Sequence, residues 1–134
     1  MIYDIQQNVI DFHNKFGHPV RDAPQEIESD EAYLALGFIE EEANELRDAI
    51  EAWKEFCECC GPEPTYDPNL VEIADALGDI VVTSYGMAIR HGIDLNAVLQ
   101  EIMSSNMTKE ANGLGKIKKG ADYRPPNIAQ VLGV

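Results

Sequence analysis

The chain has 134 residues, 45% of them hydrophobic and 25% charged, which suits one compact domain spanning 1–134 and leaves no room for a second. Its 24 Asp and Glu against 10 Lys and Arg give a formal net charge of −14, the reverse of what binding to a phosphate backbone requires. No apolar run approaches the roughly 20 residues of a membrane helix, and no secretory signal opens the sequence. We therefore expect a cytoplasmic protein with no nucleic-acid and no membrane partner.

The charge is polarised along the chain. Residues 22–79 contain 18 acidic residues and only two basic ones, whereas residues 109–134 contain five basic residues and two acidic ones. An acidic middle can hold divalent cations, and a basic tail can meet an anion. The alternative at this point is that the acidic helices are simply solvated and keep the protein soluble.

A first amphipathic helix is predicted up to Phe16, because apolar residues recur in this segment at spacings of three and four. Gly17 and Pro19 end it, and residues 18–28 form a connector without periodicity. The expected buried stripe comprises Ile2, Ile5, Val9, Phe12 and Phe16. We assign no functional role to the histidines, His13, His18 and His91.

A second helix is predicted from a cap at Ser29 or Asp30 to the cysteine cluster, ahead of Gly61. Its apolar stripe comprises Ile39, Ala43, Leu46, Ile50 and Trp53. The cysteine cluster consists of Cys57, Cys59 and Cys60. Three crowded cysteines make a poor disulfide framework, and no histidine stands at zinc-finger spacing from them, so we expect reduced thiols.

Two further helices are predicted, one from about Asn69 to Arg90 and one capped by Asp94. Gly92 between them offers a left-handed helix end. Residues 109–134 form a basic, loop-rich tail with room for one short hairpin. Four helices without a convincing alternating strand predict an all-α fold, a four-helix bundle, and the wide apolar stripes favour a dimer with a shared core.

Two acidic ridges border the apolar stripes of the second and third helices. On the second helix Glu42 lies next to the stripe, with Glu41 and Glu45 to one side of it. On the third helix three carboxylates fall within about 60° of one another in helical rotation. They are Glu72, Asp75 and Asp79. Like charges at these spacings repel, so the pattern predicts a compensating group.

A divalent cation is the compensation that the chemistry favours. If the two helices pack side by side, four carboxylates converge as oxygen donors, the ligands that Mg²⁺ and Mn²⁺ prefer. They are Glu42, Glu45, Glu72 and Asp75. Such an ion would draw a phosphate group to the same place. A di-iron site of the four-helix type is not expected, because it uses Glu-x-x-His pairs and the sequence has none.

These residues resemble the motifs of the all-α NTP pyrophosphatases, a superfamily that includes MazG-like proteins, dimeric dUTPases and phosphoribosyl-ATP pyrophosphohydrolases. The likeness rests on Glu-Glu-x-x-Glu at 41–45 and Glu-x-x-Asp at 72–75. It extends to FHNKFGHPVRDAP at 12–24, EIADALGDIVVTSYGMAIRHGID at 72–94 and SSNMTKEANGLGKIKKGADYRPPNI at 104–128, which look like segments of a MazG-like subgroup. The glycine-rich stretch at 112–115 departs from the tail expected for this subgroup.

The resemblance implies Mg²⁺-dependent hydrolysis of a nucleoside triphosphate, such as a dNTP or a non-standard NTP, to the monophosphate and pyrophosphate. It implies that Glu42, Glu45, Glu72 and Asp75 bind the metal and that Glu41 is the base that prepares the attacking water. Asp79 is expected as an additional ligand or a neighbour of one, and Asn106, Lys109 and Lys119 as contacts to the phosphates or sugar. Mn²⁺ is expected to substitute for Mg²⁺, and the assembly to be a homodimer or homotetramer.

Two other functions stay open on the sequence. One is a phosphoribosyl-ATP pyrophosphohydrolase of the same fold, which the MazG-like tail segments at 104–128 make the weaker alternative. The other is a non-catalytic helical interaction module whose acidic ridges bind a basic partner. No residue pattern identifies the base or sugar of a substrate.

Overall fold

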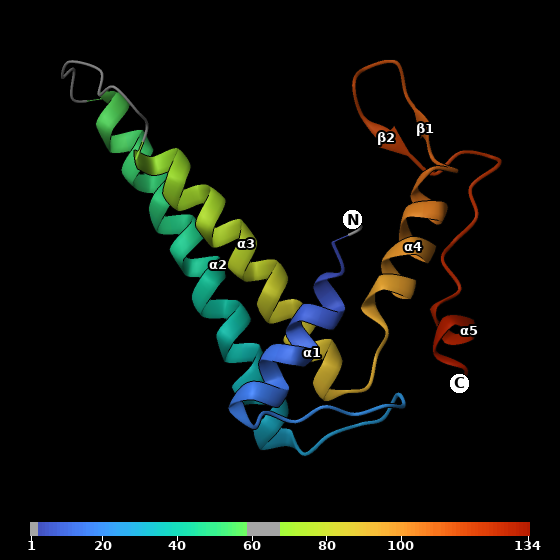
Figure 1. The fold of residues 1–134 in the computed structure, drawn as a ribbon. Coiled ribbons are helices and arrows are strands. Elements are labelled where there is room, and N and C mark those ends of the chain that lie inside the picture. The colour runs from blue at the N-terminus through green and yellow to red at the C-terminus, as the bar shows by residue number, and fades with distance from the viewer. Residues whose placement is uncertain (1–2, 59–67) are drawn as a thin grey trace.

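The computed structural model describes residues 3–58 and 68–134, and of 53–58 and 68 it describes only the backbone. This part of the chain is predominantly helical (Figure 1), which confirms the all-α fold. The helices are α1 (Ile5–Phe16), α2 (Ser29–Glu58), α3 (Pro68–Arg90), α4 (Leu95–Asn106) and α5 (Ile128–Leu132), with strands β1 (Glu110–Ala111) and β2 (Ile117–Lys118) between α4 and α5. None of the helices in the described ranges is both long enough and apolar enough to cross a membrane.

Some of the sequence predictions fall outside this description. Ile2, Gly61 and the thiols of Cys59 and Cys60 lie beyond the described residues, and so do the side chains of Trp53 and Cys57. The reduced state of the cysteine cluster therefore stays a prediction.

Capping residues fix the helix ends near the positions that the sequence predicts. The Asp94 side chain accepts a hydrogen bond from the backbone N–H of Ala97 at 3.0 Å, as the N-cap of α4. Asp4 caps α1 in the same way. Gly17 and Gly92 both have a φ of 70°, the left-handed conformation that ends a helix without strain at a Cβ atom.

The long helices α2 and α3 run antiparallel, side by side, and make the most extensive helix contact of the described chain (Figure 1). The contact is lined by small residues, with Ala35, Ala49 and Ala76 almost wholly buried. Glu31 near the start of α2 pairs with Arg90 at the end of α3, with 3.3 Å between their charged groups. Small side chains let the two backbones approach closely, so the residues beside them face each other along one seam.

The helix α1 packs on the C-terminal half of α3. Val9, Tyr85 and Ile89 form a buried apolar cluster there. Ile5, Ile10, Val20 and Leu95 pack against this cluster. The Tyr85 hydroxyl donates a hydrogen bond to the side-chain oxygen of Asn96 at 2.7 Å, which ties the end of α3 to the beginning of α4.

The predicted apolar stripes are only partly the buried faces, and this part of the prediction is wrong. Val9 is buried as expected, but Phe12 and Phe16 are each more than half exposed. On α2, Ile50 is about half exposed, whereas Ala35 and Ala49, outside the predicted stripe, are buried. The reason is that α2 meets α3 along its smallest residues, where the backbones come closest, and the larger apolar side chains flank that line.

Residues 95–134 form an arm made of α4, the hairpin β1–β2 and α5. The expected hairpin is present, with Glu110 opposite Lys118, whereas α5 was not predicted because five residues carry too little periodicity. The buried Ser105 hydroxyl donates to the carbonyl of Arg124 at 2.7 Å, and Arg124 pairs with Glu101 at 2.6 Å. These contacts hold the tail to α4, and Figure 1 shows the arm diverging from the α2–α3 pair.

Candidate functional site

Both acidic ridges face the seam between α2 and α3. Glu45, Glu72 and Asp75 line one open cavity of about 410 Å³, together with Asp48, Ala49 and Ala52. These three predicted ligands come from both helices, and the antiparallel pairing explains why. Residue numbers rise along α2 while they fall along α3, so the ridge at 41–45 meets the ridge at 72–79.

Glu42 occupies the buried line of α2, seven residues from a buried alanine on either side. Its Oε2 atom is shielded from water and has no hydrogen-bond partner among the described residues. Burial raises the pKa of Glu42, and the carboxylates of Glu45, Asp79 and Glu41 raise it further. A shielded carboxylate among other negative charges is an environment in which a bound cation would be strongly stabilised.

The donor set fits a hard divalent cation. All the predicted ligands supply carboxylate oxygens, and Glu42 Oε2 has no other partner in the described chain. In their present rotamers, no three His, Cys, Asp or Glu side chains of the described residues converge closely enough to hold an ion. Metal binding by these carboxylates therefore stays a prediction.

Glu41, the predicted base, is an exposed neighbour of this cluster. Its charge is close enough to contribute to the raised pKa of Glu42. Glu51 is also exposed, but it lies nine residues beyond Glu42, which places it on the opposite side of α2. Glu41 and Glu51 are thus comparable exposed carboxylates of the same helix, Glu41 at the ridge and Glu51 away from it.

The three predicted substrate contacts lie on the arm, and the fold does not bring them to the carboxylates of the same chain. Asn106 is the last residue of α4, and Lys109 follows it just before β1. The Lys119 ammonium lies 5.1 Å from the ring centroid of Tyr123, a cation–π contact within the arm. In Figure 1, α4 and the hairpin stand apart from α2.

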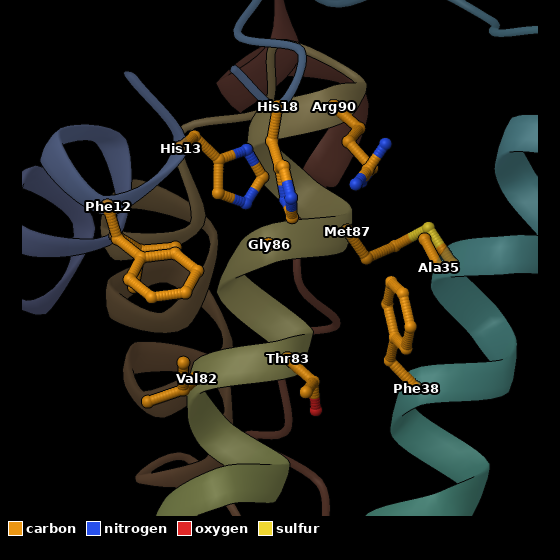
Figure 2. Close-up of a pocket in the computed structure, with 11 residues that line it drawn as sticks. Phe12, His13, His18, Ala35, Phe38, Val82, Thr83, Gly86, Met87 and Arg90 are labelled. Atoms are coloured by element: carbon orange, nitrogen blue, oxygen red, sulfur yellow. The ribbon is translucent and has the colours of Figure 1, made fainter. Parts of the chain in front are cut away.

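A second cavity, which the sequence reasoning missed, lies where α1, α2 and α3 meet (Figure 2). Its lining comprises Val9, Phe12, His13, His18, Ala35, Phe38, Val82, Thr83, Gly86, Met87 and Arg90. Two of the histidines left without a role are therefore at this cavity. His13 shares the buried face of α1 with Val9, four residues before it. This helical spacing is the feature of the sequence that could have predicted a buried His13.

Comparison with known proteins shows the family. The phosphoribosyl-ATP pyrophosphohydrolase family matches residues 9–106, most of the chain. The chain belongs to the phosphoribosyl-ATP pyrophosphohydrolase family. The match runs from α1 to the end of α4 and includes both acidic ridges. It confirms the predicted superfamily.

The chain is also similar to a viral protein, "Uncharacterized protein L479" of Acanthamoeba polyphaga mimivirus, with 36% identity over 94 residues. The aligned stretch covers 67% of this chain and 32% of the relative, so the chain spans about a third of that protein's length. The relative's name assigns it no activity.

Proposed function

We propose that this chain hydrolyses a nucleoside triphosphate, such as a dNTP or a non-standard NTP, to the monophosphate and pyrophosphate with Mg²⁺. The observation that carries the proposal is that Glu45, Glu72 and Asp75 line one cavity, within the region matched by the family. The shielded Oε2 of Glu42, without a partner in the described chain, supports a cation as part of this site.

The carboxylates divide into two roles. Glu42, Glu45, Glu72 and Asp75 would hold the metal, with Asp79 as an additional ligand or a close neighbour. A bound Mg²⁺ supplies positive charge for the phosphate oxygens and polarises the phosphoryl group. Glu41 is exposed and does not line the cavity, so it remains free to act as a base.

The reaction is an attack by water on the α-phosphorus. Glu41 takes a proton from the water as the water oxygen forms its bond to phosphorus. The bond between the α-phosphorus and the bridging oxygen breaks, and pyrophosphate leaves with that electron pair. Glu41 suits this step because its carboxylate is open to solvent at the edge of the ridge.

We also propose that the active protein is a homodimer, alone or within a tetramer. Large apolar side chains are exposed along α2 and α3 of the single chain, outside the second cavity: Leu34, Leu36, Ile50, Leu70, Val71, Leu77 and Val81. Exposed apolar surface of this extent is typical of an interface between subunits. The arm of the second copy would then supply the positive charge of Lys109 and Lys119 to the phosphates, because the hairpin of the same chain stands apart from α2.

Pyrophosphate release from a panel of NTPs and dNTPs, with Mg²⁺ or with EDTA, tests the proposed activity. We expect release from at least one triphosphate, and no release in EDTA. Phosphoribosyl-ATP belongs in the panel, because the family match makes it the second candidate substrate. Hydrolysis of that compound alone would replace the proposed substrate, and no release from any compound would favour a non-catalytic interaction module.

A further inference from the structure

The cavity where α1, α2 and α3 meet has the size and lining of a site for a small uncharged group. Its volume of about 260 Å³ is just below the roughly 300–1,000 Å³ of most ligand sites, so it suits part of a small molecule. Figure 2 shows Phe12 of α1 and Phe38 of α2 on opposite sides of the α3 segment that carries Val82 and Gly86. Both phenylalanines are partly exposed, so the cavity is open to solvent at its rim.

Arg90 lines this cavity, but its charge is already paired. Its side chain is almost wholly buried and lies 3.3 Å from Glu31. Glu31 also pairs with Arg21 at 2.9 Å. Among the described lining residues, Arg90 is the only Arg or Lys, so the cavity offers no unpaired cation of this kind to a phosphate. The lining favours an uncharged group instead.

His13 presents a hydrogen-bond acceptor to the cavity. Its Nδ1 lies 2.9 Å from the carbonyl oxygen of Pro19, and because a carbonyl only accepts, Nδ1 carries the proton. Burial lowers the pKa of His13 and outweighs the opposing effect of the Pro19 carbonyl. The ring is therefore neutral near pH 7, and its Nε2 keeps a free lone pair.

Gly86 leaves that lone pair accessible. A Cβ atom at Gly86 would lie 3.3 Å from Nε2 of His13, tighter than nine in ten real contacts of a Cβ atom. In Figure 2 the His13 ring points toward Gly86, at the wall of the cavity. A nitrogen with a free lone pair at the wall of an apolar cavity favours a ligand that donates an N–H group to it.

The cavity lies along the same seam as the carboxylates. Ala35, in its lining, precedes Glu42 by seven residues on α2, a rise of roughly 10 Å along the helix. A nucleotide whose phosphates reach the carboxylates would therefore extend its other end toward the cavity. The phosphates and the cavity would then belong to one elongated site.

We propose that this cavity holds the base of the nucleotide and that Nε2 of His13 accepts a hydrogen bond from an N–H group on the edge of that base. The proposal rests on the proposed function for the identity of the ligand. Phe12 and Phe38 supply apolar contact to the base, and His13 is a specificity-determining residue. Bases that carry an N–H group at the matching edge bind, and analogues that lack this group bind poorly.

Binding of neutral nucleosides in EDTA tests the cavity without hydrolysis and without phosphates for the acidic ridges to repel. The probes are adenosine, guanosine, cytidine, uridine and thymidine, with binding followed by calorimetry. Gly86→Ala is the test variant, because it places a methyl group against Nε2 while alanine favours a helix over glycine. Gly78→Ala on the same helix is the control, since its added Cβ meets nothing within 4 Å.

We expect at least one nucleoside to bind, Gly86→Ala to weaken it about tenfold or more, and Gly78→Ala to leave it unchanged. For the best-binding nucleoside, a derivative methylated on its edge N–H should lose a similar factor with the wild-type protein. Equal affinities of the two variants, full affinity of the methylated nucleoside, or no binding of any nucleoside would each overturn the base site. The expected binding pattern without pyrophosphate release from any triphosphate would overturn only the proposed function.

Discussion

The Glu31 carboxylate on α2 and the Arg90 guanidinium on α3 form an ion pair of 3.3 Å that fixes how the two helices are aligned. Eleven residues separate Glu31 from Glu42 on α2, and eleven separate Arg90 from Asp79 on α3. In an antiparallel pair, moving the same number of residues forward along one helix and backward along the other leads from one contact to another. The ion pair therefore brings Glu42 beside Asp79. Asp79 is indeed among the charges that raise the pKa of Glu42.

Replacing Glu31 by glutamine should lower the free energy of unfolding by about 1.5–3 kcal/mol, the range for hydrogen bonds to charged groups. The change leaves Arg90, whose side chain is only 6% exposed, without its charged partner. Urea unfolding measures the effect. Glu26→Gln, in the exposed connector, is the control and should change stability by less than about 0.5 kcal/mol. Equal losses in both variants would contradict a role of Glu31 in the alignment.

The same carboxylate predicts a pH dependence of stability. The hydrogen bond from Arg21 lowers the pKa of Glu31, and Arg90 adds to this effect. A carboxyl group with a lowered pKa stabilises the fold above its unfolded pKa and loses that contribution as the pH falls through its folded pKa. The stability difference between the wild type and Glu31→Gln should therefore be full at about pH 7 and smaller at about pH 3. Urea unfolding at both pH values checks this, and a difference that grows toward acid pH is the contrary result.

Gly17 and Gly92 offer a matched pair of substitutions, because both have a φ of 70°. A Cβ atom at Gly17 meets nothing within 4 Å. Gly17→Ala should therefore lower the free energy of unfolding only by the cost of holding alanine in the left-handed conformation, about 1–2 kcal/mol. A Cβ atom at Gly92 would overlap the backbone of Ala23 in the connector. Gly92→Ala should therefore destabilise the protein clearly more. Thermal unfolding of both variants measures the difference, and equal losses would mean that the connector does not pack against the end of α3.

The helices could be predicted from the sequence because their boundaries depend on local chemistry. Asp94 and Gly17 act on backbone groups only a few residues away, so the helix ends that they set lie close to the predicted positions. Each acidic ridge likewise follows from spacing within one helix. To predict that the two ridges meet, only one further assumption was needed: that two helices adjacent in the chain pack side by side and antiparallel.

The buried faces and the second cavity depend on contacts between helices, which no single helix reveals. Ala35 and Ala49 line the contact with α3 because small residues permit the closest approach, although larger apolar residues dominate the sequence pattern. In the sequence His13 is one of three histidines, and only the packing of α1 on α3 places it against Gly86. The divergence of the arm is also a tertiary feature, so the separation of its lysines from the carboxylates could not be foreseen.

Glu42→Gln should make the metal-free protein more stable and its stabilisation by metal smaller. Burial and neighbouring acids raise the pKa of Glu42, so its charged form is disfavoured in the fold, and an uncharged amide should raise the melting temperature in EDTA. Mn²⁺ at about 100 times its Kd should stabilise the wild type by about 2.7 kcal/mol, and Glu42→Gln by less.

The control for this comparison is Glu51→Gln, on the opposite side of α2. Its melting temperature should equal that of the wild type both in EDTA and in Mn²⁺. Differential scanning calorimetry under the two conditions measures all three proteins. An identical melting temperature of the wild type with EDTA and with Mn²⁺ would be evidence against a metal site at the seam.

The exposed apolar side chains of α2 and α3 predict association of the chain in solution. Two chains of 14.9 kDa should scatter light as a particle of about 30 kDa, and a dimer of dimers as one of about 60 kDa. The melting temperature should also rise with protein concentration, because association stabilises the folded chain by mass action. A mass of about 15 kDa at micromolar concentration would exclude the homodimer.

The division of labour between Glu41 and the metal-binding carboxylates is tested most directly by Glu41→Gln. The variant should bind Mn²⁺ like the wild type in a calorimetric titration, yet lose pyrophosphate release by about 10²–10⁴-fold, as for a lost general base. Glu45→Gln and Asp75→Asn should lose binding and turnover together, because both residues line the cavity at the seam. Glu51→Gln removes the same charge from the far side of α2 and should retain both Mn²⁺ binding and pyrophosphate release. Equal pyrophosphate release from Glu41→Gln and Glu51→Gln would contradict the assignment of Glu41 as the base.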